Sequence, residues 1–308
     1  MNQVFHGVLT ALIFVVAPGV SAETDVIHLK NGPSRKGKII GVDARYLRIR
    51  IPSPVSDQPP MEIAEPRTNI AELDFARDEE LETLLANPSL PALETNWHSH
   101  RPFLGLAKSP AGRIGIAYAE CLLTRQGVNR APEALIVLDE VVRDIWCPTL
   151  RTDARALRLR ALVAVGKWTE AVAVADAALK ESDALPVTTE AELVLGASAA
   201  RDFERLLQDN PRWDEDPRVR PEHQRLYNEA LDHFLHPFLF CGNDASAASR
   251  GLAGAIGVYQ SAGNLPDALK CARDLVALYP ETPAGEGARK LLSESQNEEA
   301  SPNPAENP

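Results

Sequence analysis

The sequence predicts a mostly α-helical protein in which a superhelical array of paired helices follows a small β-barrel domain. Apolar residues recur at helical spacing through residues 113–293, whereas they alternate with polar residues between Asp25 and Phe75. A turn glycine closely followed by alanine also recurs in the helical part. We therefore divide the chain into a signal peptide (1–22), a β-barrel (23–76), a linker with a leading helix (77–112), helical repeats (113–293) and a disordered tail (294–308).

The first residues have the features of an export signal. An apolar run from Val8 to Ala17 precedes Val20-Ser-Ala22, whose small residues suit signal peptidase. The run is shorter than the roughly 20 residues that a membrane-spanning helix needs. We expect cleavage after Ala22, no membrane insertion of the mature chain, and a soluble periplasmic or extracellular protein.

The β-domain is predicted from a two-residue hydrophobic period and from the turn pair Asn31-Gly32. A proline-rich loop, Pro52–Pro60, interrupts the period. The phrase Asp25-Val-Ile-His-Leu-Lys-Asn-Gly32, followed by Gly37-Lys-Ile, resembles the Sm-like and SH3-like barrels found at the front of exported bacterial proteins, which implies a closed barrel here. The predicted strands are Val26–Lys30, Gly37–Val42, Tyr46–Ile51, Met61–Ala64 and Ile70–Phe75.

A basic stripe lies within this domain, with Asp43 as its one acidic residue. Sm-like barrels often bind RNA, but Tyr46 is the one aromatic residue in the stripe and the whole chain has a net charge of -11. We therefore expect no nucleic-acid partner. Two interpretations stay open, a solvated strand face and a docking site for an acidic partner or envelope polymer. The stripe consists of Lys30, Arg35, Lys36, Lys38, Arg45, Arg48 and Arg50.

The helical part is predicted from residues that close one helical hairpin and begin the next. A glycine ends a helix through positive φ, and a nearby alanine lets two helix backbones approach where they cross. The phrases Gly263-Asn-Leu-Pro-Asp-Ala268 and Gly166-Lys-Trp-Thr-Glu-Ala171 share this arrangement. The residues that we expect to carry the repeat packing are Gly166, Ala171, Tyr259, Gly263, Ala268 and Pro280.

The stretch from Leu252 to Pro280 resembles a tetratricopeptide repeat, with Ala255, Ile256 and Ala272 as departures from that family's pattern. The resemblance implies a binding scaffold for a protein or peptide. A looser copy, with Gly127 and Ala134 further apart, runs from Arg113 to Pro148 and needs a longer turn.

Two more helices are predicted between the clear repeats, Thr188–Gln208 and Glu222–Phe240, and they can pair as a degenerate unit. Their proline-rich connector, Asn210–Pro221, is an insertion or a bent loop. Glycines recur at every third position within the next helix, which suits close helix packing better than dinucleotide binding. These glycines are Gly251, Gly254 and Gly257.

Cysteines and histidines are the residues of this sequence that could bind a metal ion or form disulfides. The cysteine spacings match no metal signature, and reduced core thiols are favoured over disulfides. His98 and His100 could chelate a metal from an extended segment, and Glu229, His233 and His236 share one helix face. Interhelix hydrogen bonding or a solvated helix face is the preferred role for these groups. The cysteines are Cys121, Cys147, Cys241 and Cys271.

The leading functional hypothesis is a non-catalytic scaffold or adaptor in the cell envelope that binds a protein or peptide through its helical repeats. We expect no enzyme activity, cofactor, metal or small-molecule ligand, because no nucleophile motif or phosphate-binding loop occurs. The alternative is an envelope hydrolase or metal-binding protein that uses the histidine clusters.

Overall fold

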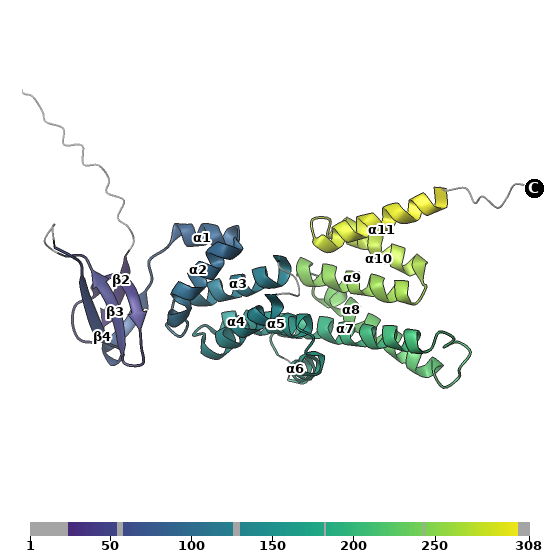
Figure 1. The fold of residues 1–308 in the computed structure, drawn as a ribbon, viewed down its shortest axis with the longest axis horizontal. Coiled ribbons are helices and arrows are strands. Elements are labelled where there is room, and N and C mark those ends of the chain that lie inside the picture. Colours follow the sequence, from purple (N-terminus) through teal and green to yellow (C-terminus); the bar gives the residue numbers. More distant parts are fainter. Residues whose placement is uncertain (1–23, 54–57, 126–129, 182, 243, 301–308) are drawn as a thin grey trace, which may run out of the picture. The chain divides into compact units, whose positions relative to one another are not determined.

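The computed structural model describes residues 24–53, 58–125, 130–181, 183–242 and 244–300, and the chain divides into two compact units, Met1–Glu79 and Glu80–Pro308. Figure 1 shows a β-unit followed in the sequence by a helical unit. A mostly helical protein with an N-terminal β-unit is therefore confirmed. The predicted signal peptide, Gly127 and the end of the predicted tail lie outside the described residues.

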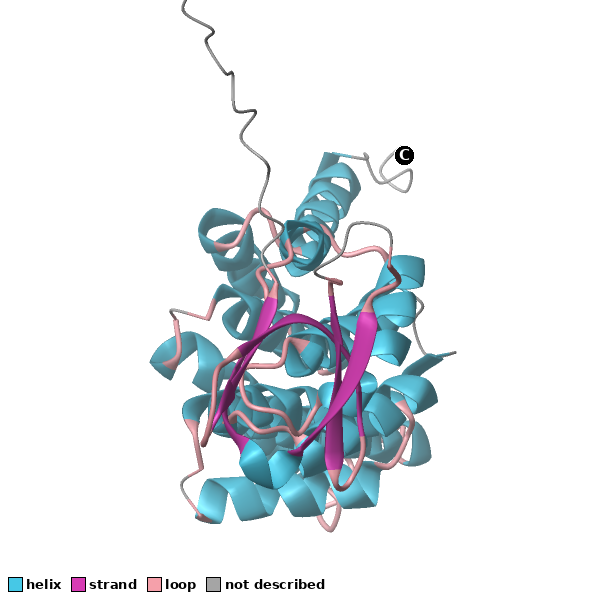
Figure 2. Cartoon of the chain, turned by 90° about the vertical axis from the view of Figure 1, so that its left-hand side faces the viewer, coloured by secondary structure: helices cyan, strands magenta, loops and turns pink. Residues whose placement is uncertain are grey.

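The β-unit is an antiparallel sheet of five strands in the order β4-β3-β2-β1-β5. Its strands are drawn in magenta in Figure 2. Alternation places Ile27, Leu47 and Ile49 fully buried on its inner face. Five strands match the number that the sequence predicts. Their bounds are β1 (Asp25–Leu29), β2 (Arg35–Val42), β3 (Tyr46–Ile51), β4 (Met61–Pro66) and β5 (Ile70–Asp74), with a short 3-10 turn at Arg67–Asn69.

The sheet is curled, as a partly buried ion pair between non-adjacent strands shows. Arg35 on β2 donates through Nε to Glu65 Oε2 on β4 at 2.9 Å, although β3 lies between these strands. Asn69 Nδ2 donates to the other oxygen of Glu65 at 2.6 Å. Strands β4 and β5 form the two edges, and no ladder joins them among the described residues. The sheet is thus open, and closure into the predicted barrel is not part of this structure.

The helical unit contains consecutive helices that pack against their sequence neighbours, and the odd-numbered helices also form a second series of neighbours, α3 with α5, α5 with α7, α7 with α9 and α9 with α11 (Figure 1). The predicted pair of intermediate helices is α7 and α8. The helix bounds are α1 (Glu79–Ala86), α2 (Leu90–His100), α3 (Ala111–Arg125), α4 (Ala131–Asp144), α5 (Pro148–Ala164), α6 (Trp168–Lys180), α7 (Leu185–Asp209), α8 (Arg220–Phe240), α9 (Ala245–Ser261), α10 (Leu265–Leu278) and α11 (Pro283–Ala300), with a 3-10 turn at Arg101–Phe103.

The two glycine–alanine phrases lie at corresponding places in the array. Gly166 and Gly263 have φ values of 77° and 71°, a conformation that glycine adopts without steric cost. Ala171 and Ala268 are fully buried, each in the first turn of the helix that follows. Tyr259 is half-buried near the end of α9. A small side chain at both alanine positions lets the paired helices approach closely.

Helices α8 and α9 approach each other through glycine. A methyl group at Gly251 would lie 2.3 Å from the carbonyl oxygen of Phe234, and one at Gly254 would lie 2.5 Å from the Phe234 ring. A methyl group at Gly196 on α7 would lie 2.9 Å from the same ring. Gly196 and Gly254 therefore leave room for the Phe234 ring, and Gly251 leaves room for the Phe234 backbone. A methyl group at Gly257, in contrast, would have no neighbour within 4 Å.

The proline-rich connector between α7 and α8 is a series of turns that is anchored by stacking. The Trp213 ring stacks on His223, with centroids 3.5 Å apart and an interplanar angle of 6°, and His223 also contacts Phe203. Because the connector returns onto α8, it is a bent loop. At the other end of the unit, α11 continues to Ala300, so the start of the predicted disordered tail is helical here.

Candidate binding groove

Four odd-numbered elements of the helical unit line one concave site. Helices α3 and α5 and the first turns of α7 and α9 surround a cavity of about 210 Å³. Its apolar lining includes Ile116 from α3 and Leu157 from α5. Both acidic and basic side chains line it, namely Glu120, Asp153, Arg160, Glu190, Asp244 and Arg250.

Two residues that line the groove form a partly buried ion pair. Arg250 on α9 donates from Nη1 and Nη2 to the two carboxylate oxygens of Glu190 on α7 at 2.9 and 2.6 Å. The Glu190 side chain is 8% exposed. Burial disfavours the charged guanidinium, but the hydrogen bonds to Glu190 outweigh it, and the pKa of Arg250 is raised. This pair joins α7 to α9 through two hydrogen bonds.

Other charged groups in the groove make longer or more exposed contacts than the Arg250–Glu190 pair. Arg160 Nη1 lies 3.9 Å from Glu120 Oε1, beyond hydrogen-bond distance, and the Glu120 side chain is 57% exposed. Asp244 caps α9 by accepting from the backbone N–H of Ala247 at 2.9 Å. The groove therefore presents apolar side chains, a guanidinium group and exposed carboxylates.

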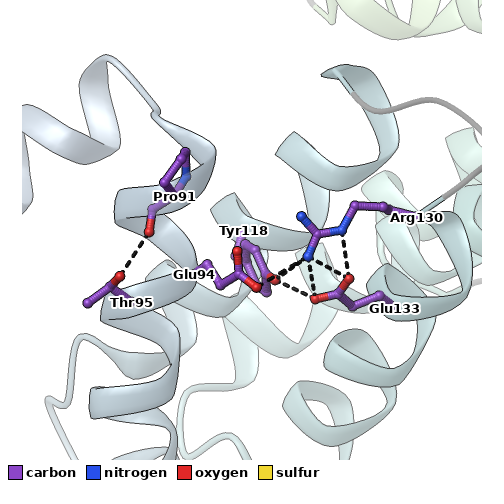
Figure 3. Close-up of polar contacts among 6 residues, drawn as sticks. All are labelled: Pro91, Glu94, Thr95, Tyr118, Arg130 and Glu133. Atoms are coloured by element: carbon purple, nitrogen blue, oxygen red, sulfur yellow. Dashed lines mark hydrogen bonds and ion pairs between the residues drawn. The ribbon is translucent and has the colours of Figure 1, made fainter.

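A second polar cluster joins α2, α3 and the start of α4 (Figure 3). The Tyr118 hydroxyl donates to Glu133 Oε1 at 2.5 Å, and Arg130 donates from Nε and Nη2 to the same carboxylate at 2.8 and 2.9 Å. Arg130 Nη2 also lies 3.3 Å from Glu94 Oε1 on α2. The cluster links three helices through one guanidinium group.

The pKa shifts in this cluster favour a positioning role. Burial and the hydrogen bond to Glu133 raise the pKa of Tyr118, so its hydroxyl stays protonated at neutral pH. Burial opposes ionisation of Glu133, but hydrogen bonds from Tyr118 and Arg130 outweigh it and lower its pKa. A protonated tyrosine beside the ionised Glu133 carboxylate, which accepts from both Tyr118 and Arg130, links α3 to the start of α4.

The structure changes the interpretation of His98 and His100. Both lie in the last turn of α2, and not in an extended segment. Residues two apart on a helix point in different directions, so these side chains do not converge on one ion. His100 Nδ1 lies 2.9 Å from the carbonyl oxygen of Asn96 on the same helix.

In the second histidine group, His233 and His236 both approach Glu192 on α7, whereas Glu229 is directed to a different partner. Glu229 pairs with Arg225, and His233 Nδ1 lies 2.6 Å from Glu192 Oε2 on α7. His236 Nε2 is 3.9 Å from the other oxygen of Glu192. The hydrogen bond to Glu192 outweighs burial and raises the pKa of His233. No group of three metal-ligating side chains occurs among the described residues.

The cysteines, which are the remaining candidates from the sequence, form no disulfide in the structure. All four cysteines are unpaired, and Cys121 and Cys241 are buried. In the described part of the chain, none of the helices has the length and apolar character needed to cross a bilayer. The groove residues Arg160, Glu190 and Arg250 were not identified from the sequence, because their helices belong to different hairpins and no local spacing joins them.

Comparison of the chain with protein-family models, with curated proteins and with solved structures found no match. The groove and the surfaces of the two units are therefore the features that can indicate a function.

Proposed function

We propose that the protein is a non-catalytic scaffold whose helical unit binds a protein or peptide partner in the groove between α3, α5, α7 and α9. The cavity of about 210 Å³ at the first turns of α7 and α9 is the observation that carries this proposal. Peptides bind along helical arrays because successive helices present one continuous surface. The mixed charges of the lining give such a surface its selectivity.

The finer assignments belong to the same proposal. The helical unit is a tetratricopeptide-like superhelix, supported by the positive φ of Gly166 and Gly263 and by the series of neighbouring odd helices. The β-unit is an Sm-like or SH3-like barrel, supported by the strand order and by the Arg35–Glu65 contact across the curled sheet. The chain is exported, and mass analysis of the mature protein should give a first residue of Glu23.

Site-specific photo-crosslinking tests the groove directly. A photoreactive phenylalanine analogue at Ala156, which lines the cavity, should cross-link a partner in the native host. The same analogue at Ala177, an exposed alanine on α6, is the matched control and should give no such product. Equal cross-linking from both positions, or none from Ala156, would remove the groove from the proposal.

The metal-dependent alternative makes a different prediction. About one zinc ion per chain in protein purified without chelators, lost on His233→Ala, would overturn the scaffold assignment. We expect no bound zinc, because the Glu229 and His233 side chains are directed to different partners.

A further inference from the structure

The outer face of the curled sheet carries four exposed cations on two adjacent strands. Lys36 and Lys38 project from β2, and Arg48 and Arg50 project from β3. Ile39, which follows Lys38, and Ile49, which lies between Arg48 and Arg50, point inward and are buried. We refer to Lys36, Lys38, Arg48 and Arg50 as the basic face. Arg35, which belongs to the same stripe in the sequence, turns inward to Glu65 and is not part of it.

The register of the sheet places like charges together on this face. Lys38 lies directly opposite Arg50 in the ladder between β2 and β3. Like charges opposite each other destabilise a sheet, so folding alone does not favour this arrangement. Such local conflicts with folding tend to occur at functional surfaces.

The positive charge of the basic face is only partly compensated. Glu62 on β4 lies 2.7 Å from Arg50, and Asp43 lies 3.6 Å from Arg48. Neither Lys36 nor Lys38 makes an ion pair within the described part of the chain. Two cations on the central strand β2 are therefore available to an anionic partner.

We propose that the basic face docks an acidic, extended protein segment. Arg50 already binds one carboxylate oxygen of Glu62 through Nε and Nη2, at 3.2 and 2.7 Å, which shows that the face accommodates carboxylates. Alternate residues of a strand are about 7 Å apart, both in the sheet and in an extended peptide. Acidic residues at alternate positions of the partner would therefore match Lys36 and Lys38.

The same face is poorly suited to nucleic acid. Tyr46 is 42% exposed and is the one aromatic side chain on β2 and β3, so stacking with successive bases is not provided. Nearly all of the net charge of -11 belongs to the helical unit, which repels a long polyanion more than a short acidic peptide. Docking here does not depend on the groove of the helical unit.

Fluorescence anisotropy with the full chain tests the proposal. The probe is a labelled peptide of about ten residues in which glutamate alternates with serine. In an extended conformation it is long enough to lie along β2 or β3. We expect binding at low ionic strength that weakens as salt is added. Lys36→Gln combined with Lys38→Gln should reduce affinity by about threefold or more, since exposed ion pairs contribute modestly. The same variant should melt no earlier than the natural protein, because it relieves the like-charge pair.

The control variant combines Lys30→Gln with Arg45→Gln, which changes net charge equally but leaves the basic face intact, and it should bind like the natural protein. Absence of peptide binding, or an equal loss in the control variant, would refute the proposal. A single-stranded oligonucleotide of equal charge, or vesicles containing phosphatidylserine, should bind less tightly than the peptide. If the oligonucleotide or the vesicles bind more tightly than the peptide, and this binding depends on Lys36 and Lys38, then a nucleic acid or a membrane is the partner of the basic face and the proposal is wrong.

Discussion

Replacing Gly251 by alanine should destabilise the helical unit. The new methyl group would lie 2.3 Å from the carbonyl oxygen of Phe234, far inside the ordinary contact range of 3.4–4 Å. That oxygen belongs to the backbone of α8, so no side-chain rotation relieves the clash and the two helices must separate. Overpacking of this kind costs about 1–3 kcal/mol. Alanine also gains about 1 kcal/mol over glycine in helix propensity, which partly offsets the cost.

Gly257→Ala is the matched control, because it lies on the same helix and its methyl group would have no neighbour within 4 Å. The propensity gain is common to both variants and cancels when they are compared. We therefore expect Gly257→Ala to be more stable than Gly251→Ala by about 1–3 kcal/mol. Urea denaturation followed by circular dichroism measures this difference. Equal stabilities would refute the close approach of α8 and α9.

Two further outcomes are expected. Ala171→Leu and Ala268→Leu should each lower the free energy of unfolding by about 1–3 kcal/mol, because both alanines are fully buried at helix contacts. The control Glu181→Gln should leave stability unchanged, and thermal melts of the three variants test this. The raised pKa of His233 means that its contact with Glu192 contributes full stability below the ordinary histidine pKa of 6.5 and loses it as pH rises through the folded pKa. The free energy of unfolding should thus decrease less between pH 5 and pH 8 in His233→Gln than in the natural protein. An equal decrease in both proteins would contradict the pairing of His233 with Glu192.

Local sequence determined much of the architecture. Apolar and polar residues alternate with a period of two between Asp25 and Phe75, around the turn pair Asn31-Gly32, so five strands could be predicted without tertiary information. Gly166 and Gly263 marked helix ends because positive φ is a local property of glycine. The pair formed by α7 and α8 was also predictable, since apolar spacing within one helix needs no distant partner.

Tertiary structure alone decided which faces meet and what remains exposed. Arg250 and Glu190 lie in different helical hairpins, and their pairing depends on how α7 packs on α9, which no local period encodes. His98 and His100 suggested a chelating pair until their helical geometry turned them apart. Arg35 and Lys36 are neighbours in one basic stripe, yet the pleat directs Arg35 to Glu65 and leaves Lys36 outside. Sequence patterns record short-range backbone preferences, whereas sites arise from long-range contacts that form when those elements pack.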